Sequence, residues 1–192
     1  INLKKFHQTK LKVEFQKINS VHLEELRSIV GDSYVFTSKE VLDINAHDYT
    51  EDLRFYPEVV LKPRTANEIS AILKFCNTQN IPATPRGAGT GLSGGALPVF
   101  GGIVISMERF NSIIQIDERN LQATVEPGVI NQVFQDAVME KSLFYPPDPA
   151  SRGSCFLGGN LAECAGGPKA VKYGVTKDYV LNCEVVLPTG EI

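Results

Sequence analysis

The sequence lacks the clusters of residues from which proteins build metal sites. It has no Cys-x-x-Cys pair, and the spacings between its four cysteines match no zinc-binding pattern. Its three histidines have no metal-ligand spacing and lie outside the glycine-rich regions. We therefore expect no metal, and we expect the reduced, mostly buried thiols of a cytoplasmic protein. The residues concerned are Cys76, Cys155, Cys164, Cys183, His7, His22 and His47.

Long apolar runs and a strong charge of either sign are also absent. No run approaches the roughly 18 to 20 apolar residues of a membrane helix, so we expect no transmembrane segment. Residues 1–17 form a charged amphipathic stretch without the apolar core of a signal peptide. The formal net charge of -3 gives nucleic-acid binding no overall electrostatic support.

The first part of the chain is predicted to alternate helices and short strands. Residues 20–31 read as a helix capped by Ser20, with Val21, Leu26, Ile29 and Val30 facing inward, and a short helix follows Ser38. A strand at 59–61 precedes a helix that starts with a Thr65–Glu68 capping box and ends near Asn80. Its inward residues are predicted to be Ile69, Ile72, Leu73 and Cys76. A second strand before residue 86 would pair in parallel with the first.

The later part is predicted to contain an antiparallel hairpin. A strand at 103–106 is followed by two strands at 113–116 and 121–125. A helix over 129–142 would bury Val133, Phe134, Ala137 and Val138. Residues 145–174 are predicted to be largely irregular, and 180–187 to form a long strand. The chain is thus predicted to have a parallel strand-helix-strand part followed by a part with an antiparallel hairpin, with the boundary near residue 110. Because residues 184–192 end as a hairpin begins, we expect a piece of a longer chain.

The segment 85–95, PRGAGTGLSGG, has five glycines and contains a literal G-x-G-x-x-G from Gly89 to Gly94. A Rossmann site needs a helix directly after this motif. Only seven residues, with Pro98 among them, separate Gly94 from the next strand signal, so that interpretation fails. A P-loop is excluded because no G-K-[ST] follows.

The same segment is better explained as a backbone cradle for an anion. Glycines with positive φ let successive N–H groups point inward, and missing β-carbons let a diphosphate approach closely. Thr90 and Ser93 add hydroxyl donors. Arg86 adds a charge, although its guanidinium can equally anchor carbonyls of the loop itself. A tight turn without a ligand is the alternative.

A second glycine-rich segment spans residues 146–174. Nearly thirty residues with little regular structure are uncommon in a compact domain unless they serve a site. Gly158-Gly159 and Gly166-Gly167 allow backbone contact with a flat ligand, and Asn160 can both donate and accept hydrogen bonds. Two separate glycine-rich loops indicate one long ligand held at two places, as a dinucleotide would be.

These motifs resemble the FAD-binding domain of the vanillyl-alcohol oxidase and p-cresol methylhydroxylase type. The loop at 85–95 is similar to its pyrophosphate loop, and Pro57 to Pro63 to its opening strand. Four later motifs resemble the branch that holds the glycolate oxidase FAD subunit, D-lactate dehydrogenase and D-2-hydroxyglutarate dehydrogenase. They are Tyr145 to Pro149, Gly158 to Ala162, Ala165 to Gly167, and Tyr173-Gly174. The likeness covers roughly residues 20–192.

The resemblance implies an α+β fold of two subdomains with FAD between them. Residues 1–50 would be an N-terminal helical segment, 51–110 the first subdomain and 111–192 part of the second, with the substrate domain absent. The phosphate loop has no His, so the FAD is expected to be bound non-covalently. The residues expected to contact it are Arg86, Gly87, Ala88, Gly89, Thr90, Gly91, Leu92, Ser93, Pro147, Asp148, Ser154, Gly158, Gly159, Asn160, Ala165, Gly166, Gly167, Tyr173 and Gly174.

The implied reaction is oxidation of a small 2-hydroxy acid, of the glycolate or D-lactate type, to the 2-oxo acid by hydride transfer to flavin N5. Companion subunits or an electron acceptor would be its partners. The base and any metal ligands would lie beyond residue 192, so no catalytic residue is assigned and this chain alone is expected to be inactive. The alternatives are a transferase like alkyl-dihydroxyacetone-phosphate synthase, a reductase of cell-wall sugar nucleotides, and a non-catalytic FAD-binding module.

Overall fold

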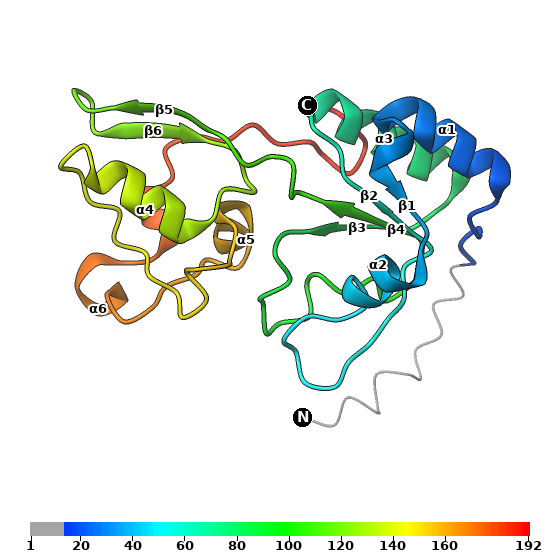
Figure 1. The fold of residues 1–192 in the computed structure, drawn as a ribbon, viewed down its shortest axis with the longest axis horizontal. Helices are drawn as coiled ribbons and strands as arrows, with labels where there is room; N and C mark the ends of the chain where they lie inside the picture. The colour runs from blue at the N-terminus through cyan, green and yellow to red at the C-terminus, as the bar shows by residue number, and fades with distance from the viewer. Residues whose placement is uncertain (1–13) are drawn as a thin grey trace.

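The computed structural model describes residues 14–192, which form two halves lying side by side (Figure 1). One half holds a four-stranded sheet, and the other holds a two-stranded hairpin with three helices. The α+β prediction is therefore confirmed. The amphipathic stretch predicted at the N-terminus falls mostly outside the described residues, as does His7. Among the described residues, no helix is long and apolar enough to cross a membrane.

The sheet of the first half has the strand order β1-β2-β4-β3. The strand β4 pairs in parallel with both β2 and β3, and β1 pairs antiparallel with β2. All residues of β2 and β4 are buried, so these two apolar strands form the centre of the core. The strands are β1 (Val35–Phe36), β2 (Val59–Leu61), β3 (Ala83–Arg86) and β4 (Ile103–Ser106).

The predicted parallel pairing of the strands around α3 is wrong in one respect. β2 and β3 are parallel, but β4 lies between them and they are not neighbours. A strand buried on both faces with ladder partners at both edges belongs at the centre of a sheet. β3 contains Pro85, which lacks an N–H and so suits an edge.

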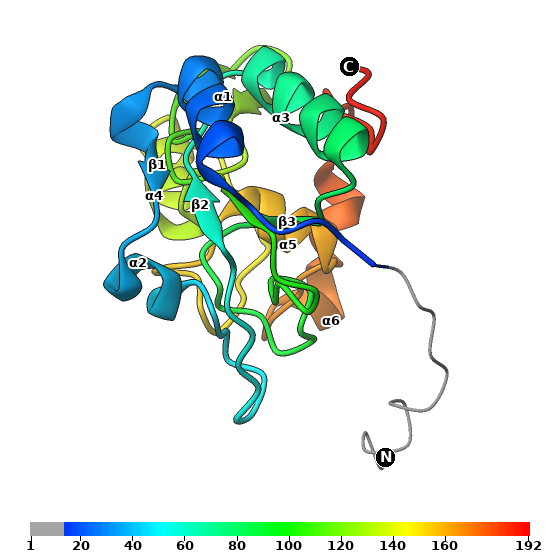
Figure 2. The ribbon, with the colours of Figure 1, turned by 90° about the vertical axis from the view of Figure 1, so that its right-hand side faces the viewer.

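Two helices cover one face of this sheet, α1 (Ser20–Val30) and α3 (Ala66–Gln79) (Figure 2). The predicted cap of α1 is shifted by one residue, because the side chain of Asn19 accepts the hydrogen bond from the His22 N–H. Val21 is correspondingly 69% exposed, and His22 is buried beside Phe75. The inward placement of Val21 was therefore wrong.

The start of α3 follows the capping-box prediction in part. Thr65 Oγ1 accepts from the Glu68 N–H at 3.1 Å as expected, but the Glu68 carboxylate accepts from the Arg64 N–H at 2.8 Å. The predicted inward face is confirmed, with Ile72 and Cys76 buried. Phe75, which the pattern missed, is buried with them. The short helix after Ser38 is also confirmed, as α2 (Lys39–Ile44), and a 3-10 turn spans Asp32–Tyr34.

The second half contains the predicted hairpin, β5 (Ile113–Asp117) and β6 (Gln122–Val125), which pack near α4 (Asn131–Met139). Phe134 and Val138 are buried in its core as predicted, whereas Val133 is 50% exposed and its inward placement was wrong. Asn131 is fully buried at the start of α4. Arg64 joins the halves by donating hydrogen bonds to Glu126 and to Ser112.

The glycine-rich segment 146–174 is more regular than predicted. It contains α5 (Leu157–Ala162) and α6 (Ala170–Tyr173), and a 3-10 turn at Thr176–Tyr179 follows. Gly158 and Gly159 lower the helix propensity of α5, so the sequence pattern concealed it. Tertiary contacts form it instead, including the antiparallel bridge between Ile130 and Phe156.

The long strand predicted over 180–187 is not formed. This stretch has no ladder partner among residues 14–192, and Leu181 is 76% exposed. A strand requires hydrogen bonds to a neighbour, which an apolar pattern alone does not supply. The chain then crosses to α3, where Asn77 donates to the carbonyl of Pro188 at 2.7 Å and Ser70 donates to that of Gly190.

Candidate functional site

The glycine loop leaves β3 at Arg86 and reaches β4 without forming a helix. This arrangement confirms that the G-x-G-x-x-G motif is not of the Rossmann type. Gly89 and Gly94 adopt φ values of 71° and 78°, in the left-handed region that favours glycine. Pro98 is buried at the far end of the loop. The loop is therefore a fixed turn between two parallel strands.

The side chain of Arg86 points into the protein and is only 7% exposed. Its guanidinium donates hydrogen bonds to the carbonyls of His47 at 2.8 Å, Ile44 at 3.3 Å and Ala96 at 3.4 Å. Burial lowers the pKa of Arg86 from its ordinary value, and the charges of Asp48 and Glu108 oppose that shift. Arg86 could either bind a ligand anion or anchor backbone carbonyls, and in the structure it anchors carbonyls.

The two glycine-rich segments face each other across the junction of the halves. A Cβ atom on Gly87 would lie 3.9 Å from the Cα of Gly159 and 3.9 Å from the Cβ of Phe156. The hydroxyl of Ser93 donates to Glu163 at the end of α5, with an O–O distance of 2.6 Å. The structure thus brings together residues that lie 70 positions apart in the sequence.

On each side of this junction a glycine has open space where a side chain would be. A Cβ atom added to Gly91 or to Gly159 would meet nothing within 4 Å. Gly91, Leu92 and Ser93 are exposed, and the rest of the loop from Gly87 to Thr90 is half-buried. A large flat or phosphorylated ligand fits such a surface, because no side chain has to move to admit it.

Asn160, which was predicted to meet a ligand, is 4% exposed and bonded within the protein. It donates to Oδ1 of Asn131 at 3.0 Å, and Asn131 in turn donates to the carbonyl of Pro147 at 3.2 Å. Asn131 thereby connects α4, α5 and the Pro147 segment. Sequence reasoning missed it, and its only signal was an amide in an otherwise apolar helical face.

Asp148 organises the loop between α4 and α5. It is 6% exposed and forms ion pairs with Arg152 at 2.7 Å and Lys169 at 3.2 Å. The hydrogen bond from Arg152 lowers the pKa of Asp148 from its ordinary value, although burial acts in the opposite direction. Its carbonyl leaves no room for a Cβ atom at Gly167, whose φ is 121°. This contact explains the glycine at 167.

The other predicted residues are spread along the same segment. Tyr173 is 38% exposed and packs edge-on against Phe144, with ring centroids 5.4 Å apart. Gly174 has a φ of 83°, beside the carboxylate of Asp178. The Ala165 carbonyl accepts from the Thr176 side chain at 2.6 Å. The Gly158 N–H donates to the carbonyl of Pro127 at 2.8 Å, and the Gly166 carbonyl accepts from the Asp148 N–H at 3.1 Å. The remaining predicted positions are exposed or half-buried: Ala88, Ser154, Gly158 and Gly166.

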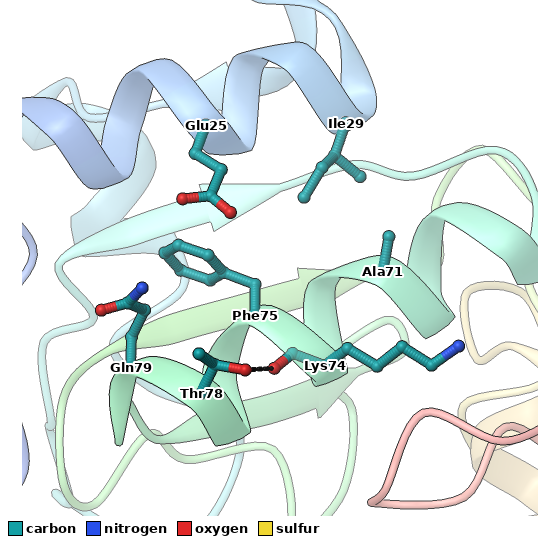
Figure 3. A pocket seen from close by; sticks show the side chains of 7 residues that line it. All are labelled: Glu25, Ile29, Ala71, Lys74, Phe75, Thr78 and Gln79. Carbon is teal, nitrogen blue, oxygen red and sulfur yellow. Dashed lines mark hydrogen bonds between the residues drawn. The ribbon is translucent and has the colours of Figure 1, made fainter.

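A separate groove of about 350 Å³ lies on the outer side of the first half, between α1 and α3 (Figure 3). None of the predicted site residues lines it. Its lining mixes apolar and polar side chains, and one of the polar ones is engaged within α3, where Thr78 donates to the carbonyl of Lys74 at 2.9 Å. The lining residues are Glu25, Ile29, Ala71, Lys74, Phe75, Thr78 and Gln79. Within the described part of the chain, no three His, Cys, Asp or Glu side chains are grouped to hold a metal ion.

The family model described as "FAD binding domain" matches residues 57–192. The chain belongs to this family, and FAD is its cofactor. The matched range includes both glycine-rich segments and the open backbone between them.

Two curated relatives are similar over most of the chain. The glycolate oxidase subunit GlcD of Bacillus subtilis is 44% identical over 169 residues, which cover 88% of this chain and 36% of that protein. The D-lactate dehydrogenase of Anaerostipes hadrus is 39% identical over 184 residues, covering 93% of this chain and 38% of that protein. The chain therefore spans little more than a third of the relatives it matches.

Solved structures share the fold. A p-cresol methylhydroxylase with bound substrate superposes with a TM-score of 0.73 at 26% identity, over 88% of this chain and 33% of that one. An alkyldihydroxyacetonephosphate synthase superposes with a TM-score of 0.82 at 21% identity, over 92% of this chain and 34% of that one. The fold is thus that of p-cresol methylhydroxylase, as the sequence motifs predicted.

Proposed function

We propose that this chain is the FAD-binding part of an oxidoreductase that converts a small 2-hydroxy acid into the 2-oxo acid. The observation that carries the proposal is the pair of glycine-rich segments that face each other at Gly87 and Gly159, with open space at Gly91. The similarity to relatives named glycolate oxidase subunit and D-lactate dehydrogenase supports the substrate class.

In this proposal the glycine loop holds the diphosphate of FAD, mainly through backbone N–H groups between Gly87 and Gly91 and through the Thr90 hydroxyl. The segment from Pro147 to Gly174 borders the flavin and ribityl parts. Arg86 and Asn160 bind protein groups in this geometry, so they support the site from behind. The division at residues 50 and 110 belongs to the same proposal. The division near 110 is supported by the two sheets, since the first ends at Ser106 and the second begins at Ile113. The division at 50 has no such support, because β1 pairs with β2 in the sheet of the first half.

The FAD is proposed to be held without a covalent bond. The loop from Arg86 to Ser93 contains no His, Cys or Tyr to which the flavin could be attached. Acid precipitation of the full-length protein should therefore release all the flavin into the supernatant. Yellow colour retained in the precipitate would contradict this.

When bound, FAD supplies the acceptor for the electrons removed from the substrate. The described residues bind and orient it, and none of them is assigned as the base or as a clamp for the substrate carboxylate. Those groups, with the companion subunits and the electron acceptor, are proposed to lie outside residues 14–192. We also propose a cytoplasmic location, which the free state of all four cysteines supports.

Anaerobic bleaching of the full-length protein tests the proposed reaction. The flavin absorbance should fall on addition of glycolate, D-lactate or D-2-hydroxyglutarate, and the acid that bleaches fastest identifies the substrate. Acetate and propionate, which lack the hydroxyl, serve as controls and should leave the spectrum unchanged. A flavin that remains oxidised with all three hydroxy acids would contradict the proposal.

The alternative is an FAD-dependent transferase, which the superposition with an alkyldihydroxyacetonephosphate synthase favours at the level of fold alone. The motifs at Tyr145 to Pro149 and Gly158 to Ala162 favour the hydroxy-acid branch instead. Unbleached flavin together with exchange of an acyl for an alkoxy group would identify the transferase. Unbleached flavin without any turnover would indicate a non-catalytic FAD-binding module.

A further inference from the structure

We propose that Arg86 is a positioning residue, whose guanidinium holds the glycine loop in its binding shape and does not contact the diphosphate. The inference rests on the FAD site of the proposed function but not on the substrate. An arginine at the start of a phosphate loop is normally expected to neutralise the charge of the ligand. A role in positioning the loop and a role in contacting the diphosphate predict different effects of substituting Arg86.

The contacts of Arg86 connect three parts of the chain. Its backbone ends β3, where its carbonyl accepts from the Met107 N–H at 2.9 Å. Its Nη1 donates to the carbonyl of Ala96, beyond the last glycine of the loop. Its Nη2 donates to the carbonyls of Ile44, the last residue of α2, and of His47, which lies between α2 and β2. One side chain thus ties both ends of the loop to a neighbouring segment.

The guanidinium also explains a glycine in the middle of the loop. Gly89 packs directly on Arg86, and a Cβ atom at this position would overlap Nη2 and Cζ. Gly89 has a φ of 71°, which lets the backbone of the loop pack against the guanidinium of Arg86. The Gly91 carbonyl accepts from the Tyr49 N–H at 3.1 Å, so the segment around His47 supports the loop a second time.

Nearby carboxylates partly offset the burial of the Arg86 charge within the protein. Asp48 is 7% exposed, and its charge acts on Arg86 to favour the protonated form. Its Oδ1 accepts from the Thr50 N–H at 2.8 Å, whereas Oδ2 has no hydrogen-bond partner among the described residues. The three carbonyls that accept from the guanidinium therefore satisfy it in the absence of a bound phosphate.

The two roles differ in their effect on the FAD-free protein. A positioning residue contributes before the cofactor arrives, so its loss lowers the stability of the FAD-free form. A phosphate contact contributes only in the complex, and its strength falls with added salt. A lysine at position 86 would preserve the charge, but it lacks the planar guanidinium that donates to three carbonyls at once.

The test uses the full-length protein with Arg86→Lys and Arg86→Gln. We expect both to lower the melting temperature of the FAD-free form by at least about 3 °C and to weaken FAD binding by about tenfold. The plot of log Kd against log salt concentration should keep the wild-type slope. Arg27→Gln, which removes a charge from α1 on the other side of the sheet, is the control and should change neither quantity.

The opposite pattern would overturn the proposal. It consists of an unchanged FAD-free melting temperature, near-normal FAD affinity in Arg86→Lys, and a flatter salt dependence in Arg86→Gln. Asp48→Asn provides a milder variant should the Arg86 variants fail to fold. The proposal predicts a lower FAD-free melting temperature and weaker FAD binding for it. Tighter binding with unchanged stability would instead place the carboxylate against the diphosphate and refute it. Substrate bleaching plays no part in these measurements, so they stand even if the proposed reaction is wrong.

Discussion

The hydroxyl of Ser93 donates a 2.6 Å hydrogen bond to Glu163, and so connects the glycine loop of the first half with the end of α5 in the second. Glu163 also lies against Gly95, where a Cβ atom would come within 2.9 Å of its Oε1. A carboxylate therefore borders the proposed diphosphate site, and both groups are negatively charged.

Glu163→Gln should tighten FAD binding. The amide still accepts the hydrogen bond from Ser93 but removes a negative charge near the diphosphate, so we expect a gain of about threefold to tenfold at low salt. FAD titration of the full-length protein, followed by flavin fluorescence, measures the effect. Glu140→Gln, an exposed residue at the end of α4, is the matched control. Unchanged or weaker binding would mean that Glu163 does not face the diphosphate.

Gly159→Ala should separate stability from binding. Gly159 lies within α5 and its side-chain position is open, so alanine should raise the stability of the FAD-free protein by about 0.5 kcal/mol through helix propensity. The added methyl group would occupy the open space at the junction and should weaken FAD binding by about tenfold. Thermal melts and FAD titration give the two values. Gly153→Ala, which is also free of contacts, should leave FAD affinity unchanged. Normal FAD affinity in Gly159→Ala would place the cofactor elsewhere.

Asn131→Leu should destabilise the second half. The substitution removes the buried amide that accepts from Asn160 and donates to Pro147, and leaves their polar groups without partners. We expect a loss of about 2 to 3 kcal/mol in the free energy of unfolding, measured by urea denaturation. Gln132→Leu is the control, because the side-chain amide of Gln132 donates its hydrogen bond to Asp136, which is exposed. An equal effect of the two substitutions would show that the Asn131 network adds nothing.

Asp148 should make stability depend on pH in the acid range. Because Arg152 lowers its pKa below 3.8 in the folded state, the carboxylate stabilises the fold above that pH, and this contribution is lost as the pH falls through the lowered value. At pH 7 Asp148→Asn should cost about 1 kcal/mol, since both cations are partly exposed and screened. The difference in melting temperature between the two proteins should be constant from pH 7 down to about pH 4 and should shrink as the pH falls further. Asp52→Asn, at an exposed site, should follow the wild type throughout.

Cys76 should resist thiol reagents. Burial raises its pKa to about 12, so at pH 8 it holds roughly a thousandfold less thiolate than an ordinary cysteine. Cys183 is exposed and provides the comparison within the same molecule. Mass spectrometry after brief alkylation of the native protein should find Cys183 modified and Cys76 intact. Equal labelling of both would show that the α1–α3 layer opens readily.

Local sequence features determined much of this protein. The Thr65 cap, the apolar strands at 59–61 and 103–106, and the hairpin turn depend on neighbouring residues, and all of them are found in the structure. The absence of a helix after Gly94 follows from Pro98 and the short spacing, and that absence alone separated this site from a Rossmann site. These features are readable from the sequence because the interactions that create them span only a few residues.

Only the tertiary structure decided what depends on distant partners. It placed β4 between β2 and β3 and left residues 180–187 without a strand to pair with. It also determined three hydrogen bonds: from Arg86 to the His47 carbonyl, from Asn160 to Asn131, and from Ser93 to Glu163. In each case the residue type permits several partners, and the choice among them is made by the packing of segments that lie tens of residues apart.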